Sequence, residues 1–172
     1  MGQDELYEQA SKAYGTALAR LAYAYEADPE KRRDLLQEIH LALWRSFDRF
    51  EDRCSLRTWV YRVAHNTAAS HVIRERRAKP QSLQSLEDLE TAPDATNHAG
   101  KTEDHLALER LMDLIHRLKP LDRQLMLLYL EEMDSASIAE ITGVSPGNVR
   151  IQIHRIKAVL ARRLHGGMTY ER

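Results

Sequence analysis

The chain has 172 residues, 43% of them hydrophobic, and a formal net charge of −1. This length allows one domain or two small ones, and the scarcity of glycine (7) and proline (5) favours helices. A single cysteine, Cys54, excludes an internal disulfide, and no apolar segment has the length of a membrane span or the form of a secretory signal. We therefore expect an all-α, cytoplasmic protein without membrane insertion.

Residues 1–79 are predicted to form one small helical domain. Residues 5–26 are rich in alanine, leucine and tyrosine, and a proline at position 29 ends this first helix. Apolar side chains at helical spacing predict a second helix over residues 30–47 and a third over most of the remaining domain. The stripes expected to face the core are Leu35, Leu36, Ile39, Leu43 and Phe47 in the second helix, and Leu56, Val60, Val63 and Thr67 in the third.

Residues 80–102 are predicted to form a flexible linker, because they are polar and lack a sustained helical period. Within them, Leu86 and Leu89 have the spacing of one short helical turn. The linker separates two basic blocks: residues 31–79 hold twelve basic and six acidic side chains, and residues 110–172 hold ten and seven. Basic blocks suit contact with nucleic-acid phosphates, although chance variation between solvated faces would give the same pattern.

Residues 103–172 are predicted to form a second helical domain. Two apolar stripes predict its first two helices: Leu111, Leu114, Ile115 and Leu118, then Leu121, Leu125, Leu128 and Tyr129. The segment that follows has the signals of a helix-turn-helix. Asp134 and Ser145 are the expected N-caps of its two helices, and Gly143 suits the turn between them, where a positive φ is needed.

The second helix of this motif has two different sides. Val149, Ile153, Ile156 and Leu160 form one buried stripe, at spacings of four, three and four. From residue 143 to residue 165 the segment has five arginine or lysine residues and no acidic residue. A helix with a buried stripe and a basic outer face suits the major groove of DNA. The alternative is an ordinary helical hairpin with a solvated basic face.

Two helical domains, a basic–acidic–basic charge pattern and a C-terminal helix-turn-helix together resemble the extracytoplasmic-function (ECF) group of bacterial sigma-70 factors. The motifs that carry the resemblance are Asp34 to Ile39 with Leu43-Trp44, then Phe50 to Asn66, then Leu118 to Arg155. The resemblance implies that residues 1–79 bind core RNA polymerase and recognise and melt −10 DNA. It implies that residues 103–172 recognise the −35 element, and that an anti-sigma factor is a further partner.

Candidate contact residues lie in both domains. The outer face of the second helix of the motif provides the −35 candidates, which are Asn148, Arg150, Ile151, His154 and Arg155. The −10 candidates are Arg57, Arg62, Asn66, Arg74, Arg76 and Arg77. The arginines are candidate phosphate contacts, and by resemblance Asn66 lies near the pocket for a flipped −10 base. A structural asparagine that bonds to the backbone is the competing interpretation, and we favour a core position for Trp59.

Asp34, Gln37 and Glu38 form a polar group within about one helical turn, where two carboxylates and an amide can meet basic residues of a partner. By resemblance that partner is core RNA polymerase; on the residues alone a solvated acidic patch is the favoured interpretation. The linker acids Glu87, Asp88, Glu90 and Asp94 suit either a segment that threads a basic channel in the polymerase or a solubilising tether.

No motif of an enzyme, cofactor site or metal site is found: the sequence lacks HExxH, a P-loop, GxGxxG and GxSxG. We therefore expect no catalytic activity, no cofactor and no metal. Two other classes remain open. A one-component helix-turn-helix transcription regulator, whose N-terminal helices sense or dimerise, would bind DNA on its own as a dimer. A helical adaptor would bind only proteins.

Overall fold

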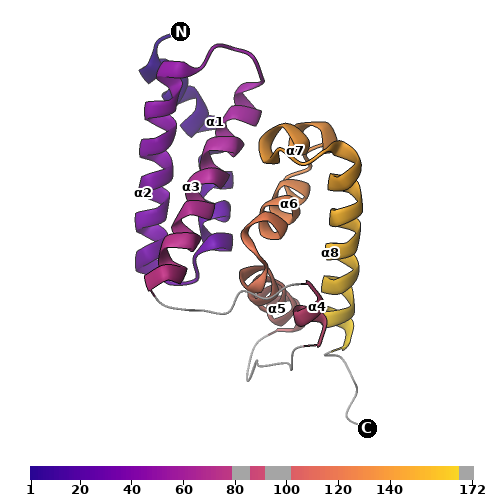
Figure 1. Cartoon of the computed structure of the whole chain (residues 1–172). Helices are drawn as coiled ribbons and strands as arrows, with labels where there is room; N and C mark the ends of the chain where they lie inside the picture. Colours follow the sequence, from indigo (N-terminus) through magenta and orange to yellow (C-terminus); the bar gives the residue numbers. More distant parts are fainter. Residues whose placement is uncertain (79–85, 92–101, 167–172) are drawn as a thin grey trace.

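The computed structural model describes residues 1–78, 86–91 and 102–166, and this part of the chain consists of helices and short connections (Figure 1). The helices are α1 (Gln3–Tyr25), α2 (Pro29–Ser46), the short 3-10 helix η1 (Phe47–Arg49), α3 (Leu56–Ala78), α4 (Leu86–Thr91), α5 (Glu103–Arg117), α6 (Pro120–Leu130), α7 (Ser135–Thr142) and α8 (Pro146–Gly166). The all-α prediction is confirmed. The predicted linker lies outside the described residues, except for α4 and Thr102, and the domain boundaries at 79 and 102 stay predictions.

Helices α1 to α3 pack side by side as one bundle. Asp28 starts α2: its side chain accepts the backbone N–H groups of Glu30 and Lys31 at 2.9 and 3.1 Å, and Pro29 occupies the first helical position. The apolar stripe predicted for α2 faces the bundle core, with Leu35, Ile39, Leu43 and Phe47 buried and Leu36 partly buried.

Helix α3 is buried on two sides, which the predicted stripe did not anticipate. Of the four predicted core residues, only Val60 is fully buried. The buried set on α3 is instead Thr58, Val60, Tyr61, Ala64, His65, Ala68 and His71. The reason is that α3 packs against α1 and α2 on one side and against α6 and α7 on the other. A helix between two layers does not show a single apolar stripe.

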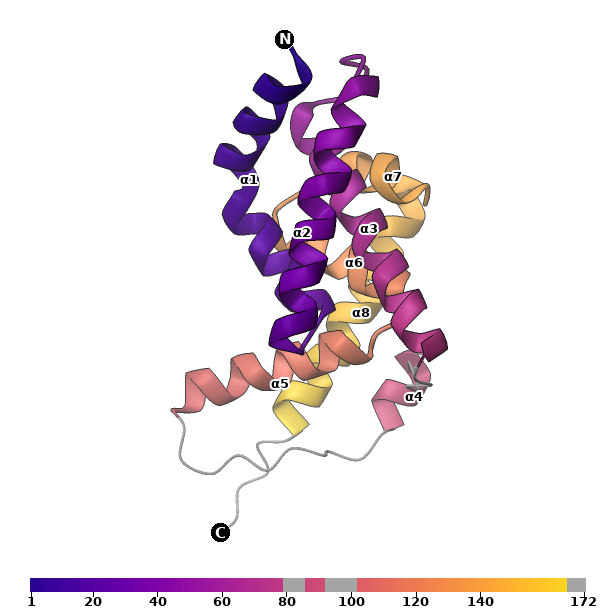
Figure 2. The same ribbon diagram turned by 90° about the vertical axis from the view of Figure 1, so that its left-hand side faces the viewer.

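Helices α5 to α8 form the second group (Figure 2). Their core includes Ile115, Leu128 and Ile156. The predicted α6 stripe is wrong at Leu121 and Tyr129, because these residues are 40% and 38% exposed. The buried positions of α6 are Arg123, Gln124, Leu125, Met126 and Leu128. Their inclusion of an arginine and a glutamine explains why an apolar pattern alone misplaced this face.

The two helix groups contact each other directly. The Glu131 carboxylate, at the end of α6, accepts hydrogen bonds from Arg20 of α1 at 3.0 Å and from the Tyr61 hydroxyl of α3 at 3.0 Å. Burial and the neighbouring Glu131 carboxylate raise the pKa of Tyr61 to about 12, so its hydroxyl stays a donor at neutral pH. An apolar cleft of about 620 Å³ lies beside this contact, between α1, α3, α5 and α6.

None of the helices in the described part of the chain combines the length and the apolar character needed to cross a bilayer. Within the same residues, no three His, Cys, Asp or Glu side chains gather in a way that could hold a metal ion.

Candidate nucleic-acid interface

The helix-turn-helix forms as the local sequence signals predict. The Asp134 carboxylate accepts the backbone N–H of Ser137 at 2.6 Å, and this bond lowers the pKa of Asp134. Gly143 adopts φ 75° at the end of α7, a conformation that glycine reaches without steric cost. The Ser145 hydroxyl lies 3.4 Å from the backbone N of Asn148, at the start of α8.

Helix α8 has a buried face and an open face. Val149, Ile153, Ile156 and Leu160 are at most 6% exposed, as predicted from their spacing. On the other face all five −35 candidates are exposed, namely Asn148, Arg150, Ile151, His154 and Arg155. Ile151 is 59% exposed, an apolar side chain in water beside basic neighbours. Such a surface can meet both phosphates and a thymine methyl group.

The C-terminal half of this open face is in contact with α4. Arg155 lies 3.1 Å from the Glu87 carboxylate, and Arg162 lies 2.6 Å from the Glu90 carboxylate. Leu89, between the two glutamates, is fully buried in the core that contains the inner face of α8. The contact lies at Arg155 and Arg162, whereas Arg150 and Ile151, near the start of α8, are exposed, so the two halves of the face differ.

The −10 candidates of α3 do not form a single open surface. Arg62 donates to the backbone carbonyl and to the carboxylate of Glu140 in α7, both at 3.2 Å. Arg57 donates to the backbone carbonyl of Glu131, and its guanidinium lies 5.8 Å from the centre of the Tyr61 ring. Asn66, Arg76 and Arg77 are exposed. The predicted core position of Trp59 agrees with its packing against the α1–α3 core.

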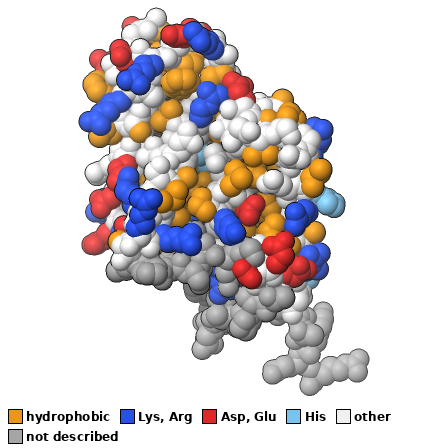
Figure 3. Space-filling view, in the orientation of Figure 1, with side chains coloured by type: hydrophobic (Ala, Val, Ile, Leu, Met, Phe, Trp, Pro, Cys, Tyr) orange, Lys and Arg blue, Asp and Glu red, His pale blue; other side chains and the backbone are white. Residues whose placement is uncertain are grey.

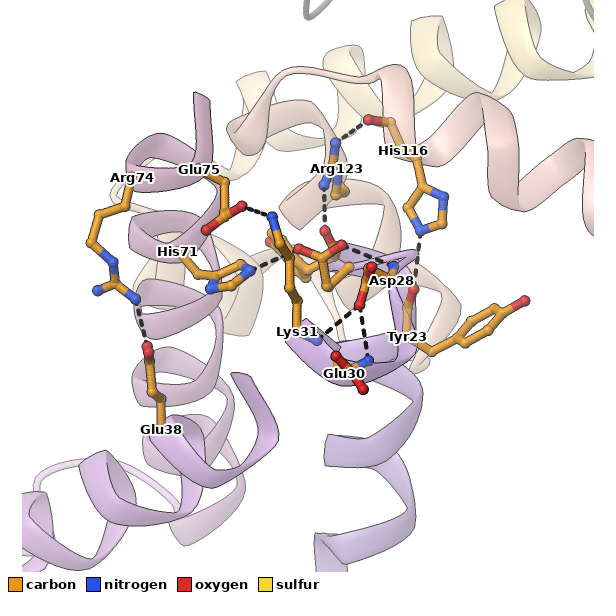
Figure 4. Close-up of polar contacts among 12 residues, drawn as sticks. Tyr23, Asp28, Glu30, Lys31, Glu38, His71, Arg74, Glu75, His116 and Arg123 are labelled. Carbon is orange, nitrogen blue, oxygen red and sulfur yellow. Dashed lines mark hydrogen bonds and ion pairs between the residues drawn. The ribbon is translucent and has the colours of Figure 1, made fainter. Parts of the chain in front are cut away.

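Arg74, the remaining −10 candidate, forms an ion pair with a residue of a different predicted site. Its guanidinium lies 2.6 Å from the carboxylate of Glu38 in α2 (Figure 4). Asp34 and Gln37 are exposed, whereas Glu38 is half-buried. The predicted polymerase-binding group therefore comprises two open residues and one that is already paired.

Sequence reasoning missed a polar cluster where α1 ends. The last backbone carbonyls of a helix lack hydrogen-bond donors within the helix. Here the second helix group supplies donors to two of these carbonyls (Figure 4). His116 of α5 donates through Nε2 to the carbonyl of Tyr23 at 3.0 Å. Arg123 of α6 donates to the carbonyl of Tyr25 at 3.3 Å. No local signal marks these residues, because their partners lie 93 and 98 positions earlier in the chain.

Comparison with known proteins identifies the family. The model of sigma-70 region 2 matches residues 11–78, and the model of sigma-70 region 4 matches residues 108–160. The ECF RNA polymerase sigma-E factor of Haemophilus influenzae is 30% identical over 138 residues, covering 76% of this chain and 73% of that protein. This chain belongs to the ECF group of the sigma-70 family. The sigma-E factor of Escherichia coli K12 is 28% identical over 134 residues, covering 74% and 70%.

Solved structures of other proteins share the fold. CnrH, in complex with the cytosolic domain of CnrY, superposes with a TM-score of 0.66 at 22% identity, covering 93% of this chain and 88% of that one. RpoE of Bartonella quintana, in complex with the anti-sigma factor NepR, gives 0.68 at 18% identity, covering 92% and 96%.

The family matches divide this ECF sigma factor in the same way as its helices. The region 2 match spans most of α1 and all of α2 and α3, and the region 4 match runs from α5 into α8. Helix α4 belongs to neither match. The contact between α4 and α8 is therefore a contact between the segment that joins the two regions and the second helix of the helix-turn-helix.

Proposed function

We propose that this sigma factor binds core RNA polymerase, recognises promoter DNA and thereby directs transcription initiation in the cytoplasm. The observation that carries the proposal is the order of the two regions, region 2 followed by region 4, in a chain whose α8 exposes a basic face. In this role the protein binds and positions other molecules. We propose that it performs no chemistry of its own and needs neither a cofactor nor a metal.

The direct test combines the purified chain with core polymerase and measures transcription from a library of promoter fragments. We expect transcripts that start at a defined subset of promoters and that require both components. A chain that leaves the polymerase unselective, yet binds DNA alone as a stable dimer, would instead support the one-component regulator. Binding to proteins without any promoter selection would support the adaptor.

The −35 element is the proposed target of α8. Arg150 can donate two hydrogen bonds to guanine, and the exposed Ile151 can pack on a thymine methyl group. Asn148, His154 and Arg155 complete the proposed contact face. The ion pair with Glu87 competes with DNA for the guanidinium of Arg155.

Replacing Arg150 by alanine should cost about 1–3 kcal/mol of promoter affinity and relax preference at one −35 position. The measurement is transcription from a library of −35 variants by the two holoenzymes. Lys157→Ala is the matched control, because the Lys157 ammonium points to the Tyr129 hydroxyl, 2.9 Å away, and should leave the sequence profile unchanged. Identical profiles for wild type and Arg150→Ala would remove Arg150 from the base-reading residues.

The −10 element is the proposed target of α3. Asn66, Arg76 and Arg77 are the open candidates, with Asn66 proposed to meet a base and the arginines to meet phosphates. Arg57, Arg62 and Arg74 hold partners within the chain, so their proposed contacts require those bonds to break.

Core RNA polymerase is the proposed partner of α2, through Asp34, Gln37 and Glu38. Reversing both acids, Asp34→Lys with Glu38→Lys, should weaken the complex with core enzyme by about tenfold or more, because like charges then face each other. The free energy of unfolding should change by only about 1 kcal/mol, since both groups are at the surface. The control is Glu8→Lys with Glu103→Lys, two exposed acids on other helices. Equal affinity of both double variants for the polymerase would contradict the assignment.

An anti-sigma factor is the proposed inhibitor. Of the similar solved structures, the sigma factor RpoE is in complex with the anti-sigma factor NepR, and CnrH is in complex with the cytosolic domain of CnrY. The supporting feature here is the apolar cleft between the two helix groups, which exposes Tyr23 and Leu108 at its edge. Affinity purification from native cells should recover such a protein in some growth conditions. Recovery of polymerase alone under all conditions would argue against this partner.

A further inference from the structure

The contact between α4 and α8 combines a buried anchor with two ion pairs. Leu89 is fully buried in the same core as Ile156, Val159 and Leu160 of α8, and Leu86 is packed against that core. The short helix is therefore held on α8 by apolar burial, which does not depend on charge. Figure 1 shows α4 beside the C-terminal half of α8.

The two ion pairs place acids where a DNA-binding face would meet phosphates. Arg155 and Arg162 are seven residues, about two helical turns, apart and thus share one face of α8. Glu87 and Glu90 meet them at 3.1 and 2.6 Å. Acidic and basic side chains lie next to each other on this part of the surface (Figure 3). Arginine binds carboxylate and phosphate by the same charge-assisted hydrogen bonds, so the two acids compete with DNA for the same donors.

We propose that α4 is an intramolecular competitor of promoter DNA: in the free chain its two glutamates pair with Arg155 and Arg162 of α8, and α4 must leave α8 when DNA binds. The inference rests on the proposed function, since it needs α8 to bind DNA. A contact of the same kind is found in region 2, where Arg62 of α3 is paired with Glu140 of α7. The free chain therefore holds arginines from both proposed DNA faces on its own acids.

The competition predicts that the free chain binds DNA more weakly than a chain whose α4 has left α8. The apparent affinity equals the affinity of that open form multiplied by the fraction of molecules in it. Because Arg155 and Arg162 would meet phosphates, this reduction applies to duplex DNA of any sequence. Leu89→Ala removes the anchor without changing the net charge, so a gain in DNA affinity cannot come from added electrostatic attraction.

The experiment measures binding of the full-length chain to a fluorescent 20-base-pair duplex of random sequence at low salt, without polymerase. Leu89→Ala should bind about tenfold more tightly than wild type, and Leu41→Ala, at an exposed leucine of α2, should bind like wild type. The double variant Glu87→Gln, Glu90→Gln should bind the duplex several-fold more tightly than the control double variant Glu8→Gln, Glu103→Gln. The control removes the same charge at positions away from α4. Cleavage by a glutamate-specific protease after Glu87 and Glu90, mapped by mass spectrometry, should accelerate about tenfold in Leu89→Ala.

Two results would overturn the inference. Cleavage as fast in wild type as in Leu89→Ala would mean that α4 does not stay on α8. Accelerated cleavage without tighter DNA binding would mean that α4 covers no DNA-binding residue. Circular dichroism confirms that each variant is folded, and the glutamine variant keeps the anchor should Leu89→Ala destabilise the core. Promoter-selective transcription by the wild-type holoenzyme is measured separately, so the proposed function can stand while this inference falls.

Discussion

Replacing Arg123 by alanine should lower the free energy of unfolding by about 3–5 kcal/mol, because each buried carbonyl left without a donor costs about 1–3 kcal/mol and the cavity adds to the loss. The side chain is 2% exposed. Its guanidinium donates to the backbone carbonyls of Tyr25 at 3.3 Å and Leu118 at 3.1 Å, and also to that of His116. Removing it leaves buried carbonyls without a donor and a cavity beside the Tyr25 ring, whose centre lies 5.4 Å from the guanidinium carbon.

Urea denaturation at neutral pH measures this loss. Arg77→Ala, at an exposed arginine of α3, is the control and should change stability by about 0.5 kcal/mol or less. Arg123→Lys should fall between the two, because one ammonium group cannot reproduce the wide fork of a guanidinium. A loss of less than about 1 kcal/mol for Arg123→Ala would show that the carbonyls find other donors.

Features set by near neighbours in the chain could be predicted from the sequence. Asp134 caps a backbone N–H only three residues away, and Gly143 takes the positive φ that its turn requires. The buried stripe of α8 follows from helix period alone, and so does the exposure of Arg150 and Ile151 on the opposite side. The prediction of an all-α protein with a C-terminal helix-turn-helix depended on signals of this kind.

Features set by contacts between distant segments could not be predicted. A stripe analysis assigns one inner face to each helix, whereas α3 buries residues against both groups of helices. The arginine at position 123 gives no sign in the sequence that its partners are carbonyls of α1 and α5. In the candidate site, the sequence could predict which residues of α8 are exposed. It could not predict that Arg62 pairs with Glu140 or that Arg155 pairs with Glu87, because these pairs depend on tertiary packing.

Acidification should destabilise the fold through His65. This side chain is fully buried between α1 and the second helix group, and its Nδ1 lies 2.9 Å from the Tyr25 hydroxyl. Burial lowers the pKa of His65 from its ordinary value of 6.5 to about 3. Burial also raises the pKa of Tyr25, so the hydroxyl keeps its proton and can donate a hydrogen bond to Nδ1 of the neutral imidazole.

The direction of the effect follows from which state takes up the proton. The unfolded chain protonates His65 near pH 6.5, whereas the folded chain resists protonation until about pH 3. Protons therefore favour unfolding. The stability that depends on neutral His65 is fully present above pH 6.5 and falls as the pH drops from 6.5 towards 3. Between pH 7.5 and pH 5.0 the expected loss from this one group is about 2 kcal/mol.

The measurement compares urea denaturation at pH 7.5 and pH 5.0 for wild type and His65→Asn, whose amide oxygen can still accept from Tyr25. Burial also lowers the pKa of His40 and His116, so part of the acid sensitivity should remain in the variant. His105→Gln, at a histidine whose side chain is 56% exposed, should lose as much stability on acidification as wild type. The His65→Asn variant should lose about 2 kcal/mol less than wild type over this pH range. An unchanged loss would mean that His65 is protonated without unfolding, and that water or a neighbouring acceptor reaches its ring in the folded chain.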